Sequence, residues 1–337
     1  MRLITFLLAT FLVSSPLLSQ RLSRDDAKTR LMEFLEQYSP DSHDMMVRLS
    51  QLGNQYKIGS SQITLSPEQS PLTWVRERTE KGIIESLNTV VHECMHGFTS
   101  RYAFQMLEEN PPADYEFGQD YSVFYISPDE MYLVKHSDVF TSNKLKQEIP
   151  KPLRTFRYNP YIAPRDNNLG SQIQGIYGLM DEWNAYYHGT RTAYDLFDYY
   201  KNKAQDKDKK VYLDHVSNLA GTYFAYYEFK YYILKYLEMA RQDYPDRYQE
   251  LMDNTEMRKA YTAIDDRFTA LVDLFEERLD TIETLVTSDN YTSVYRQDGF
   301  YFIGSNGVGI FSDEANLLKK ELETDALKRL DQAIRIQ

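Results

Sequence analysis

The chain has 337 residues and a mass of 39.7 kDa, enough for one large domain or two smaller ones. Its formal net charge of -12 argues against binding to nucleic acid or to anionic lipid, because an acidic surface repels both. A single cysteine, Cys94, excludes an intramolecular disulfide, so packing must stabilise the fold.

The first residues have the pattern of an export signal. Arg2 supplies a positive charge, residues 3–13 are apolar, and a polar end leads to Ser19, a small residue that suits cleavage. The sequence therefore predicts a signal peptide over residues 1–19 and a mature protein exported to the periplasm or the extracellular space. No later apolar run reaches about eighteen residues, so we expect no stable membrane insertion after cleavage.

The next segments predict a helix, a strand and a long helix. Residues 25–38 have an amphipathic helical pattern, and residues 56–65 alternate as a short strand does. From Trp74 to Met106 no proline occurs and apolar residues recur at steps of three and four, which predicts one helix with a buried stripe. This helix should end near Asn110, because two prolines follow it.

The long helix contains the sequence His92-Glu93-Cys94-Met95-His96. Residues four apart lie on one helix face, so both histidines can bind a single Zn²⁺ while Glu93 lies beside it as a general base. The alternative is a pair of surface histidines one turn apart. Cys94 falls on the apolar stripe, which favours a small buried side chain over a nucleophile.

At this motif the chain resembles the zincin metallopeptidases, whose HExxH pattern lies on an active-site helix. The metzincin extension of the motif is absent, because Thr99 stands where its glycine would be sought and no histidine follows at the spacing of its third ligand. The resemblance therefore implies a gluzincin-like site, in which a second helix projects a glutamate to the zinc. It also implies a peptidase that uses a zinc-activated water.

Glu182 is the best candidate for the third ligand. Residues 169–201 predict a helix, and on it Glu182 interrupts a stripe of small residues that would let another helix approach closely. An isolated carboxylate in such a seam must be paired or metal-bound, because burying it alone is too costly. The stripe consists of Gly175, Gly178, Ala185 and Gly189. The alternative ligands are Asp181, His188 and Asp195.

Two further residues are candidates for catalysis by stabilising the oxyanion or orienting a ligand. Tyr186 follows Glu182 by one turn, where thermolysin has an aspartate. His215 lies in a helix predicted over residues 211–241, where the alternative is a histidine satisfied by helix contacts. Tyr187 and His188 compete for the same role.

The remaining pattern predicts small β elements and two more helices. Residues 121–126 and 131–135 indicate a hairpin, which would either hold extended substrate by main-chain pairing or serve only the fold. Residues 257–286 predict a helix, and residues 293–311 a second hairpin that turns at 304–307. Residues 313–336 predict a final helix capped by Ser312.

The sequence thus predicts a mainly α (α+β) protein in which residues 20–337 form one unit. Residues 20–168 carry the HExxH motif, and the tyrosine-rich residues 169–337 carry the third ligand. The expected function is an exported zinc-dependent peptidase acting on a peptide or protein substrate, with Glu93 as general base and His92, His96 and Glu182 as ligands. The alternatives are a non-catalytic protein that binds peptide or glycan and a zinc amidase acting on a non-peptide or cell-envelope substrate.

Overall fold

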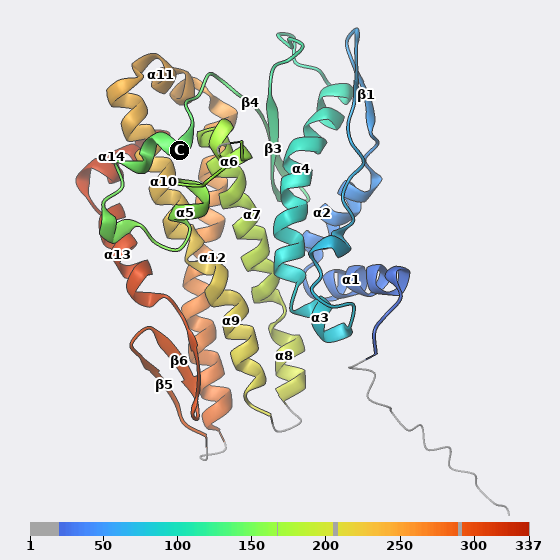
Figure 1. The fold of residues 1–337 in the computed structure, drawn as a ribbon, viewed down its shortest axis with the longest axis vertical. Coiled ribbons are helices and arrows are strands. Elements are labelled where there is room, and N and C mark those ends of the chain that lie inside the picture. The colour runs from blue at the N-terminus through green and yellow to red at the C-terminus, as the bar shows by residue number, and fades with distance from the viewer. Residues whose placement is uncertain (1–19, 167, 205–207, 289–291, 337) are drawn as a thin grey trace, which may run out of the picture.

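The computed structural model describes residues 20–166, 168–204, 208–288 and 292–336. The predicted signal peptide lies outside these residues. The described part is mainly helical and carries three small antiparallel sheets, as the sequence predicts for the fold class (Figure 1). None of its helices is both long enough and apolar enough to cross a bilayer.

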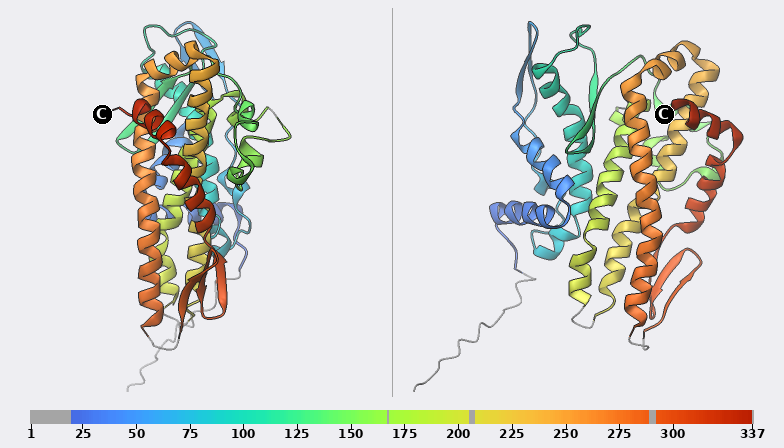
Figure 2. Two further views of the ribbon diagram at one scale, coloured as in Figure 1. Left: turned by 90° about the vertical axis from the view of Figure 1, so that its left-hand side faces the viewer. Right: turned by 180° about the vertical axis from the view of Figure 1, so that it is seen from behind.

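A group of helices from the second half of the chain packs lengthwise around one large core. Figures 1 and 2 show α7 and α12 running beside α9 and α10, which follow one another end to end, with α4 on the outer side of α7. The bounds are α7 Ile176–Asp195, α8 Phe197–Ala204, α9 Val211–Tyr223, α10 Ala225–Asp243, α11 Pro245–Asp253 and α12 Thr255–Thr287.

A second, smaller core lies under the N-terminal elements and is built largely on α4. These elements are α1 Arg24–Tyr38, α2 Pro40–Gln51, β1 Gln55–Ile58, β2 Ser61–Thr64, the short η2 Pro71–Trp74, α3 Glu80–Ile84 and α4 Leu87–Glu109. Ala185 and Leu196, on and just after α7, also belong to this core. Because Trp183 of the same helix is buried in the large core, α7 separates the two cores and contacts both.

The predicted first hairpin is confirmed and also lies between the two cores. Strand β3 Tyr121–Ser127 pairs antiparallel with β4 Glu130–Lys135. Val123 and Tyr125 face the N-terminal core, whereas Phe124 and Ile126 face the large one. This is the alternation expected of a strand buried on both faces, because successive side chains point to opposite sides.

Between this hairpin and α7 the chain forms only short helices. They are η3 Ser142–Lys146, η4 Lys151–Leu153, α5 Tyr158–Tyr161 and α6 Gly170–Ile173. The described part of this connection into α7 therefore consists of short helices joined by irregular backbone. In Figure 1 this green segment lies across the upper part of α7 and α10.

Several predicted helices are broken into two. The helix expected from Trp74 to Met106 is divided into α3, which begins at Glu80, and α4, which begins at Leu87; at the break the hydroxyl of Ser86 donates to the carbonyl of Gly82. The helix expected over 169–201 is divided at Gly175, whose φ of +54° ends α6 before α7 begins. The helix expected over 211–241 breaks at Phe224, between α9 and α10.

The predicted strand over residues 56–65 is in fact a hairpin, β1 and β2, that turns at Gly59 with a φ of +59°. The predicted second hairpin is a three-stranded meander of β5 Val294–Gln297, β6 Phe300–Ile303 and β7 Asn306–Gly309. Its additional turn is at Asp298-Gly299, where both residues have positive φ. Turn residues inside these short alternating segments therefore divide them into more strands than the alternation alone predicted.

The end of the chain also differs from its prediction. Ser312 is the first helical residue rather than the cap, because Phe311 takes the cap position in a left-handed conformation without a capping side chain. The expected single helix is α13 Ser312–Leu322 followed by α14 Asp325–Ile334. Helices α2 and α11 were not predicted; each has proline at its first position, the place in a helix where proline is favoured.

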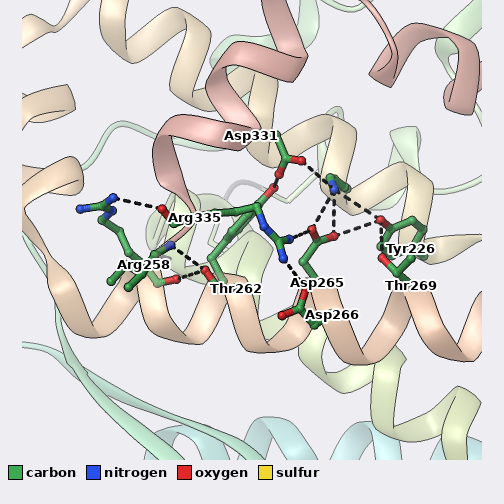
Figure 3. A network of polar contacts seen from close by, with 11 residues as sticks. Tyr226, Arg258, Thr262, Asp265, Asp266, Thr269, Asp331 and Arg335 are labelled. Carbon is green, nitrogen blue, oxygen red and sulfur yellow. Dashed lines mark hydrogen bonds and ion pairs between the residues drawn. The ribbon is translucent and has the colours of Figure 1, made fainter.

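The last helix, α14, is attached to α12 by a network of buried and half-buried charges (Figure 3). Lys230 of α10 lies 2.9 Å from the Asp265 carboxylate and 3.1 Å from Asp331. Arg335 pairs with Asp265 and Asp266, so that α14 is held at both its middle and its end. Removing one partner of a buried pair leaves the other charge unpaired in poorly solvated surroundings.

We therefore expect Lys230→Met to lower the free energy of unfolding by about 3 kcal/mol, because Asp265 and Asp331 lose their shared cation. Lys259→Met is the matched control, because the Lys259–Glu256 pair on α12 is exposed and should contribute less than about 0.5 kcal/mol. Urea unfolding of both variants measures the difference. Equal losses would contradict a structural role for the buried network.

Candidate metal centre

The HExxH motif lies in the first half of α4, and the helix presents its histidines to α7. Val91, Met95 and Phe98 fill the N-terminal core from the neighbouring face of α4. His92 and His96 are half-buried at the edge of this core. The predicted position of the two histidines beside the buried stripe is therefore confirmed.

The two helices approach closely where small residues meet. A Cβ atom added to Gly189 would lie 2.8 Å from the carbonyl oxygen of Asn88 and 3.4 Å from the Cβ of His92. Ala185, one turn earlier, is fully buried against the α4 core. The predicted seam of small residues is therefore a helix contact with α4 at Ala185 and Gly189, whereas Gly178 faces Gly170 of α6 and Gly175 faces Phe140 and Tyr236.

This contact brings His92, His96 and Glu182 together. The Nε2 atoms of the two histidines are 3.2 Å apart. The Oε2 atom of Glu182 is 3.7 Å from His92 Nε2 and 3.5 Å from His96 Nε2. The three side chains come from two helices, and each is 12 to 26% exposed.

These separations match a tetrahedral zinc ion. Ligand atoms about 2.05 Å from a tetrahedral centre are roughly 3.3 Å from one another, and the three observed distances lie close to that value. Glu182 Oε2 is buried and has no hydrogen-bond partner among the described residues. Two imidazole nitrogens and one carboxylate oxygen are also the donor set that zinc accepts, so the residues fit the ion.

Asp181 supports the cluster from the side. The Nδ1–H of His96 donates a hydrogen bond of 2.7 Å to Asp181 Oδ2, which fixes the tautomer and leaves Nε2 free to face Glu182. Although burial favours the neutral ring, Asp181 and Glu182 raise the pKa of His96 well above its ordinary value. Burial, together with His96 and Arg157, lowers the pKa of His92. Asp181 was an alternative ligand in the sequence prediction; it lies outside the three-residue cluster and contacts the candidate ligand His96 instead.

Glu93 is half-buried beside the same cluster. Burial raises the pKa of its carboxyl group, and the nearby Glu182 raises it further, while His96 opposes the shift. A carboxylate with a raised pKa is better suited to accept and return a proton near neutral pH. Gly97 directly follows His96, and a Cβ atom added to it would meet the carboxylate of Glu68. The loop before η2 therefore lies over this part of α4.

Tyr186 lies against the cluster of His92, His96 and Glu182, as expected for a residue one turn after Glu182. The centre of its ring is 4.4 Å from that of His92, with the planes at 63°. Its hydroxyl group is 3.0 Å from that of Tyr161 in α5. Tyr161 was not identified from the sequence, because it lies in an irregular segment where no periodicity indicates which side chains point inward.

The other candidates have different partners. His188 Nε2–H donates to the carbonyl of Tyr125 at 2.8 Å, and burial lowers the pKa of this histidine to about 4. Asp195 accepts hydrogen bonds from Arg191 and Ser39. Neither belongs to the cluster. The Tyr125 contact also occupies a main-chain acceptor of β3, one of the groups that substrate pairing to the hairpin would use.

The structure does not bring His215 to the site. This residue is fully buried between the rings of Phe197 and Tyr200, and neither ring nitrogen has a hydrogen-bond partner among the described residues. Phe197 follows the far end of α7, about 20 Å along the helix from Glu182. Burial lowers the pKa of His215 to about 3, so the imidazole is neutral near pH 7 and serves as a packed core side chain. It has none of the contacts that the predicted role requires.

Cys94 is buried, as predicted, in the N-terminal core. Burial raises the pKa of its thiol to about 12, with Glu68 and Glu93 adding to the shift. A thiol with such a pKa is not ionised near neutral pH and is a poor nucleophile. Of the chemical groups in the motif, the two imidazoles and the carboxylate of Glu93 therefore remain available for function.

No family model, curated protein or solved structure matches this chain.

The helix contact at Gly189 makes a direct prediction about stability. Gly189→Ala should lower the free energy of unfolding by about 1 to 3 kcal/mol, because the new methyl group overlaps the Asn88 carbonyl and forces α4 and α7 apart. Gly221→Ala in α9 is the control, since no atom lies within 4 Å of its added Cβ and alanine is favoured in helices by about 1 kcal/mol. Denaturant unfolding measures both, and a stabilised Gly189→Ala variant would contradict the close approach.

Proposed function

We propose that the protein is an exported zinc-dependent hydrolase of zincin type, most specifically a peptidase. The observation that carries the proposal is the near-tetrahedral spacing of His92, His96 and Glu182 on two packed helices. Three protein ligands and a half-exposed position beside them are typical of a catalytic zinc site, whereas structural sites have four protein ligands. The export pattern of residues 1–19 supports the location.

In this mechanism His92, His96 and Glu182 hold the metal, and Asp181 orients His96. When bound, zinc would polarise the substrate carbonyl and lower the pKa of a water molecule. Glu93 takes a proton from the attacking water as the carbon–oxygen bond forms. It then transfers the proton to the amide nitrogen as the carbon–nitrogen bond breaks, which releases a carboxylate and an amine.

We assign to Tyr186 the donation of a hydrogen bond to the substrate oxygen. Its ring lies against His92, and its hydroxyl group meets that of Tyr161 in α5. A donor at this position stabilises negative charge that develops on the carbonyl oxygen in the transition state. The partly dry surroundings strengthen that interaction.

The metal content tests the ligand set. We expect about one zinc per purified wild-type chain by elemental mass spectrometry, and its loss in His92→Ala and Glu182→Ala. His43→Ala is the control, because His43 of α2 lies outside the cluster and should leave the zinc in place. Asp181→Asn should keep the site but weaken zinc binding roughly 10- to 100-fold. Wild-type protein without zinc after zinc repletion would overturn the proposal.

The general base has a separate test. Glu93→Gln should retain zinc and lower hydrolysis of a fluorogenic peptide library by at least about 10²-fold, because glutamine cannot accept the proton of water. Glu109→Gln, an exposed position at the end of α4, is the control and should keep wild-type turnover. Undiminished cleavage by the Glu93→Gln variant would rule out the assigned role.

A further inference from the structure

Behind Tyr186 lies a fully buried ion pair between Arg157 and Glu228. Arg157, just before α5, donates from Nη1 to Glu228 Oε2 at 2.6 Å, and its Nη2 donates to the carbonyl of Gly221 at 2.6 Å. The other carboxylate oxygen of Glu228 accepts from the hydroxyl of Thr155 and from the backbone N–H of Arg157. The guanidinium group is therefore fixed at both terminal nitrogens, whereas its Nε has no hydrogen-bond partner among the described residues.

The free face of this guanidinium group lies on Tyr186. Its central carbon is 4.2 Å from the centre of the Tyr186 ring, within the range of a cation–π contact. The same ring contacts His92, and its hydroxyl group meets Tyr161. Tyr186 is thus held by a cation, by an imidazole and by a hydroxyl group.

Stability alone is a weak reason for a buried ion pair at this place. Replacing such a pair with apolar side chains of similar size is often neutral or stabilising, because both ions lose their hydration on burial. A planar, fixed guanidinium group, in contrast, defines where an aromatic ring can lie against it. The pair also joins the α5 segment, which carries Tyr161, to α10.

We infer that Arg157 is a positioning residue that, anchored by Glu228, holds Tyr186 against His92 with its hydroxyl group directed by Tyr161. The Tyr161 and Tyr186 hydroxyl groups are 3.0 Å apart and either can donate to the other; in the arrangement where Tyr161 donates, the Tyr186 hydrogen is left for an acceptor in the site. The consequence for turnover rests on the proposed hydrolase function. The consequence for the geometry of Tyr186 and His92 does not, so the two can be tested separately.

The test uses the mature full-length protein and the double variant Arg157→Met/Glu228→Gln, which removes the pair without leaving one charge unpaired. The control is Lys230→Met/Asp265→Asn. It removes another buried pair, which joins α10 to α12 and lies beside α14 (Figure 3). Unfolding midpoints and circular dichroism establish that both variants are folded.

The first readout needs neither zinc nor substrate. The measured quantity is the proton NMR chemical shift of the His92 imidazole in the zinc-free protein. The signal is assigned by its loss in His92→Gln, and its position reports the ring current of Tyr186. Tyr186→Leu gives the reference position without the ring. We expect the Arg157→Met/Glu228→Gln signal to move toward this reference and the control signal to stay at the wild-type position.

The second readout is turnover. The Arg157→Met/Glu228→Gln variant should lose roughly tenfold in kcat with little change in KM, because a displaced Tyr186 affects the transition state more than substrate binding. Arg157→Lys keeps the charge but not the planar face, and should give a smaller shift of the His92 signal than the double variant. The control double variant should keep the wild-type kcat.

A folded Arg157→Met/Glu228→Gln variant with the wild-type His92 signal would overturn the inference. If the double variant does not fold, an unshifted His92 signal in Arg157→Lys has the same meaning. Wild-type protein that hydrolyses no peptide would instead count against the proposed function, and the His92 signal would still decide the role of Arg157.

Discussion

The candidate metal centre depends on how closely α4 and α7 can approach one another. The two helices meet where Gly189 faces the Asn88 carbonyl, at a distance that no larger residue would allow without a shift. Two imidazoles on one helix and a carboxylate on the other can share an ion only if the helices lie this near. A methyl group at Gly189 would therefore act on the ligand geometry as well as on packing, because it also points at His92.

The position of the cluster between two hydrophobic cores follows from the same contact. The apolar face of α4 fills the N-terminal core, while Trp183 of α7 is buried in the large one. The candidate ligands occupy the boundary, where they are neither fully buried nor freely hydrated. A half-buried position remains open to water while weakening the competition of bulk solvent for charged groups. Asp181 adds a carboxylate that orients His96.

The site was more predictable than the helix boundaries. The motif residues and Glu182 follow from spacing on regular helices, where periodicity fixes which side chains share a face. The breaks at Ser86, Gly175 and Phe224 could not be read from apolar periodicity, which continues across them. Residues that act from irregular segments, such as Tyr161 and Arg157, leave no periodic signal, and their partners become visible only in three dimensions.

Helix α10 carries two buried ion pairs that lie in different surroundings. Glu228 and Lys230 stand two residues apart and therefore point to different sides, one toward Arg157 and the candidate site, the other toward Asp265 and α14. Both pairs are buried, yet only the first touches a ring that contacts a candidate ligand. Because both pairs are buried and both begin on α10, a difference in their effect on Tyr186 would arise from position. This makes the second pair an internal reference for the first.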